Sequence, residues 1–230
     1  MSFFFCPADL ALGTSVELEG DIAHHIGTVR RIKKGEEIQL QDPRMRRFLT
    51  RVEAVTKRSV TITPLSEINV PQESVHSVTL IQALVSEQNI DLILQKSTEL
   101  GVQKIVLFQS EHSPHSIRTD RLPHKLDRWT EIARNACEQS GRPSLPLIIV
   151  TPSLTDALED AEGVIVALDQ SGDAFPNPQT LTLIVGPEGG LSEGEISLLK
   201  NRSALFARIG AYTLRSETAA LAGLASALRS

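Results

Sequence analysis

The sequence predicts an α/β fold with a parallel sheet, preceded by a small β-rich domain. Residues 1–70 hold several short strand-like runs bounded by turn residues, which suggests a small barrel. Residues 71–230 alternate short apolar runs with longer amphipathic ones, as in a parallel sheet covered by helices on both faces. At residues 181–195 a strand, a glycine-rich loop and a helix follow one another. This order predicts a ligand site at the carboxyl end of a strand.

The run at residues 181–195 is the most informative stretch of the chain. Leu181–Val185 is a short apolar run that ends in β-branched residues and is typical of a buried strand. Ser192 and Glu195 have capping-box spacing, so a helix is expected directly after Ser192. The loop 186–190 contains three glycines, which allow backbone to approach a ligand closely. Its Glu188 disfavours phosphate and suits a neutral or cationic ligand, although a tight turn without a ligand is an equal alternative.

The remaining elements follow from periodicity and from turn and capping residues. In the first domain, Asp21 is expected to cap a short helix that runs to about Thr28. The strands expected there are residues 37–41, 48–55 and 59–63. In the second domain we expect strands at residues 78–84, 105–108, 147–150, 164–168, 181–185 and 205–209. The expected helices are residues 89–100, 126–140 and 154–161, one from residue 193 and one from Thr218.

Composition indicates an ordinary globular protein without a membrane segment. Hydrophobic residues make up 41% and charged residues 22% of the chain, and no apolar run is long enough to span a bilayer. We expect no signal peptide, because Phe3–Phe5 is too short and has no basic segment before it. Cys6 and Cys137 are far apart and have no metal-ligand spacing, so we expect free thiols, no metal and a cytoplasmic location.

Positive charge is concentrated in the first domain. The chain has a net charge of -5, yet residues 30–58 contain ten Lys or Arg and only four Asp or Glu. Such a local basic patch on an acidic protein favours contact with nucleic-acid phosphates, whereas a solvated hairpin tip is the simpler alternative for its arginines. The candidates for RNA contact are Arg30, Arg31, Lys33, Lys34, Arg44, Arg46 and Arg47.

A second loop of the ligand-binding kind is expected at the same edge of the sheet. Residues 210–218 follow a predicted strand and precede the last helix, as residues 186–190 do for their own strand and helix. Arg215 and Glu217 are the charged side chains of this loop. They could simply form an ion pair, and Glu217 is also favoured by the dipole of the helix. Two such loops at one edge favour a shared binding site.

Three runs together resemble one known family. They are the Gly186–Gly190 loop followed by Leu191 and Ser192, the run Leu214–Ala219, and the run Glu138–Arg142. In this combination they resemble the RsmE family, which comprises 16S ribosomal RNA uridine N3-methyltransferases of the knotted SPOUT superfamily. The resemblance covers nearly the whole chain. It implies methylation of N3 of a uridine, uridine 1498, in 16S rRNA of the small ribosomal subunit.

The resemblance also implies a fold, a cofactor and roles for individual residues. The expected fold is a SPOUT-type parallel sheet with a C-terminal trefoil knot after a PUA-like RNA-binding barrel. The expected cofactor is S-adenosylmethionine, and the expected assembly is a homodimer. Arg215 and Glu217 would be catalytic, and Arg142 joins the candidates for RNA contact. The cofactor would contact Leu168 with Asp169, Val185, Gly186, Pro187, Glu188, Gly189, Gly190, Ile209, Gly210 and Leu214.

The chain departs from the family pattern at two places, and two alternative functions stay open. Ser86-Glu87 stands where the family usually has a lysine, and His112 replaces an arginine. One alternative function is that of another SPOUT methyltransferase, which acts on tRNA or on a ribose 2'-hydroxyl. The other is a non-catalytic RNA-binding protein with a degenerate pocket.

Overall fold

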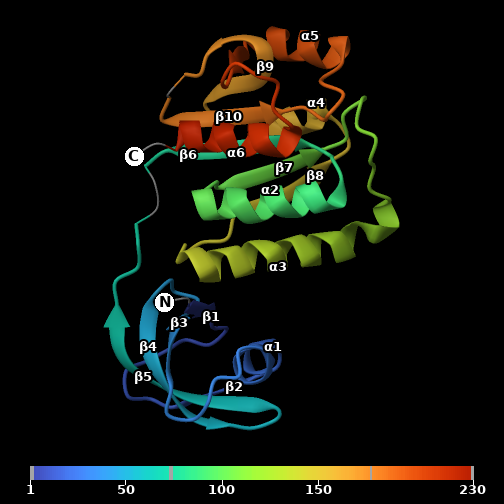
Figure 1. The fold of residues 1–230 in the computed structure, drawn as a ribbon. Coiled ribbons are helices and arrows are strands. Elements are labelled where there is room, and N and C mark those ends of the chain that lie inside the picture. The colour runs from blue at the N-terminus through green and yellow to red at the C-terminus, as the bar shows by residue number, and fades with distance from the viewer. Residues whose placement is uncertain (1–2, 73–74, 177, 229–230) are drawn as a thin grey trace. The chain divides into compact units, whose positions relative to one another are not determined.

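The computed structural model describes residues 3–72, 75–176 and 178–228. The chain divides into two compact units (Figure 1). The first unit comprises Met1–Gln72 together with Cys137–Ser144, and the second comprises Glu73–Ala136 and Leu145–Ser230.

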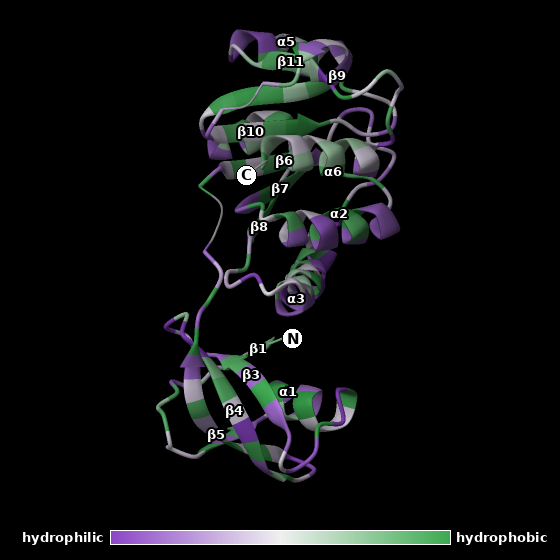
Figure 2. Ribbon diagram, turned by 60° about the vertical axis from the view of Figure 1, so that its left-hand side comes forward, coloured by the Kyte–Doolittle hydropathy of each residue, from purple (hydrophilic) through white to green (hydrophobic). Residues whose placement is uncertain are grey.

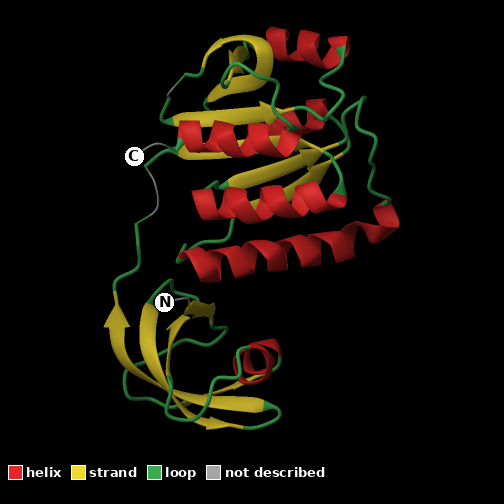
Figure 3. Cartoon of the chain, in the orientation of Figure 1, coloured by secondary structure: helices red, strands yellow, loops and turns green. Residues whose placement is uncertain are grey.

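The first unit is built on a curled five-stranded sheet (Figure 3). Its strands follow the order β1-β3-β4-β5-β2, and only the β1–β3 pair is parallel. The bounds are β1 Phe3–Phe5, β2 Val16–Glu19, β3 Glu37–Gln41, β4 Arg47–Val55 and β5 Ser59–Ile68. The core of this sheet includes Phe4, Leu10, Ile26, Leu40, Phe48, Val52 and Ile62. Strands β1 and β2 were not predicted.

The helix expected from Asp21 is shorter than predicted and is capped differently. Helix α1 covers only Asp21–His24, and a π-helical turn, His25–Val29, continues it. Gly20 occupies the N-cap with a φ of 69°. The prediction that Asp21 caps this helix is therefore wrong, since Asp21 is its first helical residue.

The second unit is built on a six-stranded sheet in which every pair is parallel, as predicted. The strands lie in the order β11-β9-β10-β6-β7-β8. Their bounds are β6 Ser77–Ala83, β7 Lys104–Phe108, β8 Leu147–Thr151, β9 Val164–Ala174, β10 Thr180–Val185 and β11 Leu205–Arg208. Hydrophobic residues are concentrated along the central strands β10, β6 and β7 (Figure 2).

Helices cover both faces of the six-stranded sheet, as a parallel sheet requires. One core cluster joins the sheet to α2 and α6 and includes Leu80, Ile93, Leu183 and Leu224. The other joins the opposite face to α4 and α5 and includes Ile81, Leu154, Ile184 and Leu199. The bounds are α2 Glu87–Leu100, α3 Leu122–Ser140, α4 Leu154–Ala157, α5 Glu193–Asn201 and α6 Ser216–Ala227.

Helices α2 and α3 end where predicted, before glycines, whereas other boundaries differ from the prediction. Gly101, at a φ of 101°, ends α2, and Gly141, at 84°, follows α3. The helix predicted at residues 154–161 is instead α4 followed by a 3-10 turn, Leu158–Asp160. Strand β9 continues six residues beyond the predicted end at Leu168. Its extension pairs with β11 after a shift of register between Phe206 and Ala207.

The small residues of α6 serve contacts within the chain. A Cβ atom placed on Gly223 would lie 2.7 Å from Cδ2 of Leu183, so the glycine lets α6 lie close to β10. Helix α6 also packs against α2. The homodimer and the trefoil knot stay predictions. No helix within the described residues has the length and apolar character needed to cross a membrane.

Candidate functional site

The second unit contains a pocket of about 470 Å³ at the carboxyl ends of β10 and β11, beside the middle of β9. Residues 168–170 of β9, the loop after β10 and Ile196 of α5 line it. Residues 206–209, residues 213–216 and Ala219, which lie before and after the loop that follows β11, complete the lining. The two glycine loops therefore face the same cavity, as the order of strands and helices predicted. Nine of the candidate cofactor residues line the pocket, namely Leu168, Asp169, Val185, Gly186, Pro187, Glu188, Gly190, Ile209 and Leu214.

The loop after β10 is held by bonds of its own and by the helix that follows it. The Gly190 N–H donates to the Pro187 carbonyl oxygen at 3.0 Å, and Gly190 has a φ of 76°. Ser192 and Glu195 form the predicted capping box, in which the Glu195 N–H donates to Ser192 Oγ at 3.1 Å. Because helix α5 is fixed in this way, the preceding loop has a defined end at the pocket.

Gly189 and Gly210 are candidate cofactor residues that do not line the pocket. A Cβ atom on Gly189 would lie 3.2 Å from the Cβ atom of His112, so this glycine makes room for the loop after β7. The His112 imidazole contacts the Gly190 carbonyl oxygen at 3.2 Å. Gly210 has a φ of 73°, which a residue with a side chain rarely adopts. Both glycines shape the loops from outside the cavity.

The two predicted catalytic residues lie on different sides of the start of α6. Arg215 lines the pocket and is exposed. Glu217 is not among the lining residues, and its Oε2 atom accepts a hydrogen bond from Asn89 Nδ2 at 3.2 Å. Helix α6 begins at Ser216, two residues before the predicted start at Thr218, and Arg215 occupies its N-cap position. The Ser216 hydroxyl donates to the Gly186 carbonyl oxygen at 2.8 Å.

Sequence reasoning missed several residues that line the pocket. Gln170 lies in the extension of β9, and Phe206 and Arg208 belong to the strand β11 that pairs with it. The signal that could have identified Gln170 is its position two residues after Leu168, beyond the predicted end of the strand. The pocket also contains the carboxylates of Asp169 and Glu188. Because Arg208 and Arg215 also line the pocket, it suits a ligand that has apolar surface and carries both positive and negative charge.

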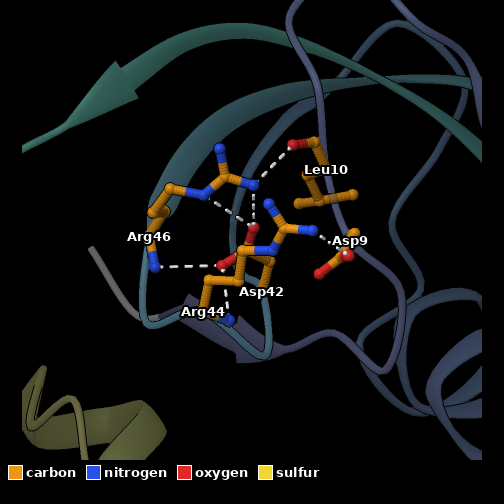
Figure 4. A network of polar contacts seen from close by, with 5 residues as sticks. All are labelled: Asp9, Leu10, Asp42, Arg44 and Arg46. Carbon is orange, nitrogen blue, oxygen red and sulfur yellow. Dashed lines mark hydrogen bonds and ion pairs between the residues drawn. The ribbon is translucent and has the colours of Figure 1, made fainter.

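In the first unit, the arginines of the β3–β4 turn are partly used within the unit. Asp42 is buried and accepts hydrogen bonds from the backbone N–H groups of Arg44 and Arg46, each at 3.0 Å (Figure 4). The Arg46 guanidinium donates to Asp42 Oδ2 and to the carbonyl oxygen of Leu10. Arg44 forms an exposed ion pair with Asp9 at 2.8 Å. These bonds give the turn a defined shape.

The other candidate RNA-binding residues divide into exposed and buried groups. Arg47 differs from the expectation of a side chain at an open turn, because it is the first residue of β4 and is buried. Its guanidinium donates to Gln41 Oε1 at 2.8 Å and to the Gly141 carbonyl oxygen at 3.2 Å. Arg142 is also buried. The exposed candidates are Arg30, Arg31, Lys33 and Lys34.

Comparison with known proteins identifies the family. Residues 71–228 match the model of the RNA methyltransferase domain, and residues 18–65 match that of the RNA methyltransferase PUA domain. A ribosomal RNA small subunit methyltransferase E from Mesomycoplasma hyopneumoniae is 31% identical over 86% of this chain and 87% of that relative. The chain belongs to the RsmE family of RNA methyltransferases. The predictions of a SPOUT-type sheet and a PUA-like first domain are thereby confirmed.

Other proteins and solved structures are similar to nearly the whole chain. The protein of the same name from Bacillus subtilis is 28% identical over 91% of this chain and 88% of its own length. A protein from Legionella pneumophila, solved in complex with SAM, superposes with a TM-score of 0.89 at 30% identity, over 96% of this chain and 94% of that chain. The structure of the Neisseria gonorrhoeae RsmE bound to S-adenosylmethionine superposes with a TM-score of 0.86 at 31% identity. The match covers 98% of this chain and 95% of that chain.

Proposed function

We propose that this RsmE family member transfers a methyl group from S-adenosylmethionine to N3 of a uridine, uridine 1498, in 16S rRNA of the small ribosomal subunit. The observation that carries the proposal is the convergence of the loop after β10 and the loop after β11 on one pocket. The names of the similar proteins, which specify the small ribosomal subunit, support the substrate class.

The residues of the pocket fit S-adenosylmethionine. A volume of about 470 Å³ lies within the usual range of small-molecule sites. Leu168, Leu191 and Leu214 offer apolar surface for the adenine ring, whereas the carboxylates of Asp169 and Glu188 complement the positive charges of the sulfonium and ammonium groups. We propose that the candidate cofactor residues that line the pocket contact the cofactor directly. Gly189 and Gly210 would act by shaping the two loops.

The chain has to orient the uracil base and manage one proton. The bound cofactor supplies an electrophilic methyl group, and uridine N3 must lose its proton for the new N–C bond to form. The Watson–Crick edge of uracil carries N3, so the base must be unpaired to reach the pocket. We assign Arg215, exposed at the pocket, to the negative charge that develops on the uracil carbonyl oxygens. Glu217, which is hydrogen-bonded to Asn89 beside the pocket lining, would either orient Arg215 or accept the N3 proton.

The first unit would supply most of the affinity for RNA. Ion pairs within the unit engage Arg44 and Arg46. Within the described residues no such ion pair engages the exposed side chains of Arg30, Arg31, Lys33 and Lys34, which therefore suit contact with phosphates. We also propose, from the family resemblance, that the chain forms the trefoil knot and a homodimer and acts in the cytoplasm.

The experiment that tests this function maps the methylated nucleoside. The protein is incubated with isotope-labelled S-adenosylmethionine and small ribosomal subunits that lack the modification, and the rRNA is then digested and analysed by mass spectrometry. We expect labelled 3-methyluridine at one position. A labelled ribose 2'-O-methyl group, or labelling of tRNA alone in a parallel reaction, would instead indicate another SPOUT activity. No transfer, together with no binding of the cofactor in dialysis, would indicate a non-catalytic RNA-binding protein.

A further inference from the structure

Gln82 is a polar residue on an otherwise apolar face of the central strand β6. Val78 and Leu80 alternate along the strand, Leu84 follows its end, and all three belong to the core cluster that α2 and α6 cover. Gln82 continues this alternation and is fully buried. In the sheet it is paired with Val185, which lines the pocket. A buried amide is costly where an apolar side chain of similar size would pack as well, so Gln82 calls for an explanation.

The amide of Gln82 begins a directed chain of hydrogen bonds that ends at the pocket. Its Nε2 atom donates to the Ala83 carbonyl oxygen at 2.8 Å and to Ser216 Oγ at 2.9 Å. Ser216 Oγ in turn donates to the carbonyl oxygen of Gly186 at 2.8 Å. Both Ser216 and Gly186 line the pocket. The chain therefore joins β6 to the loop after β10 and to the first turn of α6.

The orientation of the amide follows from its partners. A carbonyl oxygen such as that of Ala83 only accepts, so the NH2 side of the amide must face it. Ser216 Oγ then receives a hydrogen from Gln82, which leaves its own hydrogen for Gly186. This orientation leaves the amide oxygen unsatisfied. Gln82 Oε1 is buried and has no hydrogen-bond partner among the described residues, which is energetically unfavourable.

We propose that Gln82 is a positioning residue for the methyl-transfer site. By orienting the Ser216 hydroxyl, it fastens the first turn of α6 to Gly186 and thereby fixes the place of Arg215, the residue before Ser216. Leucine or methionine at position 82 would fill the same space but would leave Ser216 free to rotate. The proposal rests on the proposed function for its effect on methyl transfer, but its effect on the two loops is a property of the protein without cofactor.

The test compares Gln82→Met with a matched control in the neighbouring strand. Thr182→Val also removes a buried hydrogen-bonding group, since Thr182 Oγ1 is bonded to the backbone of Glu162, but at a distance from the pocket. Hydrogen exchange of the cofactor-free protein is measured over residues 186–190 and 216–219. We expect faster exchange in both segments for Gln82→Met and wild-type exchange there for Thr182→Val. Ser216→Ala should reproduce the effect of Gln82→Met. The double variant should exchange no faster than either single variant, because the two groups act as one unit.

Binding and turnover provide the second readout. For Gln82→Met and Ser216→Ala we expect about tenfold weaker binding of S-adenosylmethionine by calorimetry and a lower kcat. Ser216→Thr, which keeps a hydroxyl, should restore most of the affinity. If wild-type protein does not bind the cofactor, the proposed function fails, while the exchange data still decide the role of Gln82. Wild-type exchange in both segments of a folded Gln82→Met or Ser216→Ala variant would overturn the proposal.

Discussion

Ser110 and Glu195 join the loop after β7 to the helix that follows the pocket loop. Ser110 Oγ donates to Glu195 Oε2 at 2.9 Å, although the two residues are 85 positions apart. The same carboxylate is buried and also accepts the backbone N–H groups of Glu111, at 3.3 Å, and Ser192, at 2.8 Å. One carboxylate therefore caps α5 and fixes the segment that contains His112, which contacts the pocket loop at Gly190.

Replacing Glu195 should destabilise the second unit. Glu195→Ala removes a buried acceptor from three donors, so we expect the free energy of unfolding in urea to fall by roughly 2 kcal/mol. Glu193→Ala is the matched control, because Glu193 lies in the same first turn but is exposed. It should change stability by no more than about 0.5 kcal/mol. Equal effects of the two substitutions would contradict this role of Glu195.

Gly172 should tolerate no side chain, in contrast to Gly194. A Cβ atom on Gly172 would lie 2.6 Å from the backbone of Phe206 and Ala207, where β11 crosses the extended part of β9. We expect Gly172→Ala to lower the free energy of unfolding by roughly 1–3 kcal/mol. Gly194 is in α5 and has ordinary contact space, so Gly194→Ala should be neutral or stabilising by about 0.5 kcal/mol. Thermal unfolding of both variants checks the prediction, which fails if Gly172→Ala melts like the wild type.

Asp42 should make the stability of the first unit depend on pH in the acid range. Burial raises the pKa of Asp42, but hydrogen bonds from Arg46 and Leu10 and the charge of Arg46 together hold it below its ordinary value. A carboxyl with a depressed folded pKa stabilises the protein above its unfolded pKa, about 3.9, and that contribution is lost as the pH falls through the folded pKa.

The variant Asp42→Asn tests this dependence. We expect it to be less stable than wild type by roughly 1–3 kcal/mol at neutral pH, and the difference should shrink below about pH 4. Urea unfolding followed by circular dichroism at a series of pH values measures both quantities. Asp9→Asn is the control within the same network, because the exposed Asp9–Arg44 ion pair should contribute little to the free energy of unfolding. A constant stability difference at all pH values would rule out the titration of Asp42 as the cause.

The exposed lysines of the first unit should contribute to the salt dependence of RNA binding. Removing Lys33 and Lys34 together should weaken binding to 16S rRNA and reduce the slope of log affinity against log salt by about 1–2. Lys200→Ala removes an exposed positive charge from α5 and should leave the slope nearly unchanged. Arg47→Ala should lower stability instead, because its guanidinium is bonded inside the unit. An unaltered slope in the double lysine variant would exclude these side chains from phosphate contact.

The sequence was sufficient for those elements whose signals are local. The capping box of Ser192 and Glu195, the glycine that ends α2 and the alternation of strands and helices each act within a few residues, and all agree with the structure. The convergence of the two loops followed from the rule that parallel strands end at one edge of the sheet. Strands β1 and β2 were missed because they have only three and four residues and depend on partners distant in the chain.

Exposure and long-range pairing could not be read from the sequence in the same way. Arg47 belongs to a basic cluster in the sequence, but its burial depends on Gly141, 94 positions away. The polar extension of β9 has no strand signal, and it is a strand because β11 pairs with it across Gly172. The hydrogen bond between Ser216 and Gly186 likewise joins residues 30 positions apart, so no local pattern indicates it.

The most direct measurement of the central claim is the rate of methyl transfer to unmodified small subunits by Arg215→Ala. Arg215 lines the pocket where both loops meet, so losing its charge should slow transfer by about 100-fold or more. Calorimetry should show the affinity for S-adenosylmethionine changed by less than about threefold. Arg202→Ala, which removes an exposed arginine outside the pocket, should transfer at the wild-type rate. Wild-type transfer by Arg215→Ala would contradict the assignment of the reaction to this pocket.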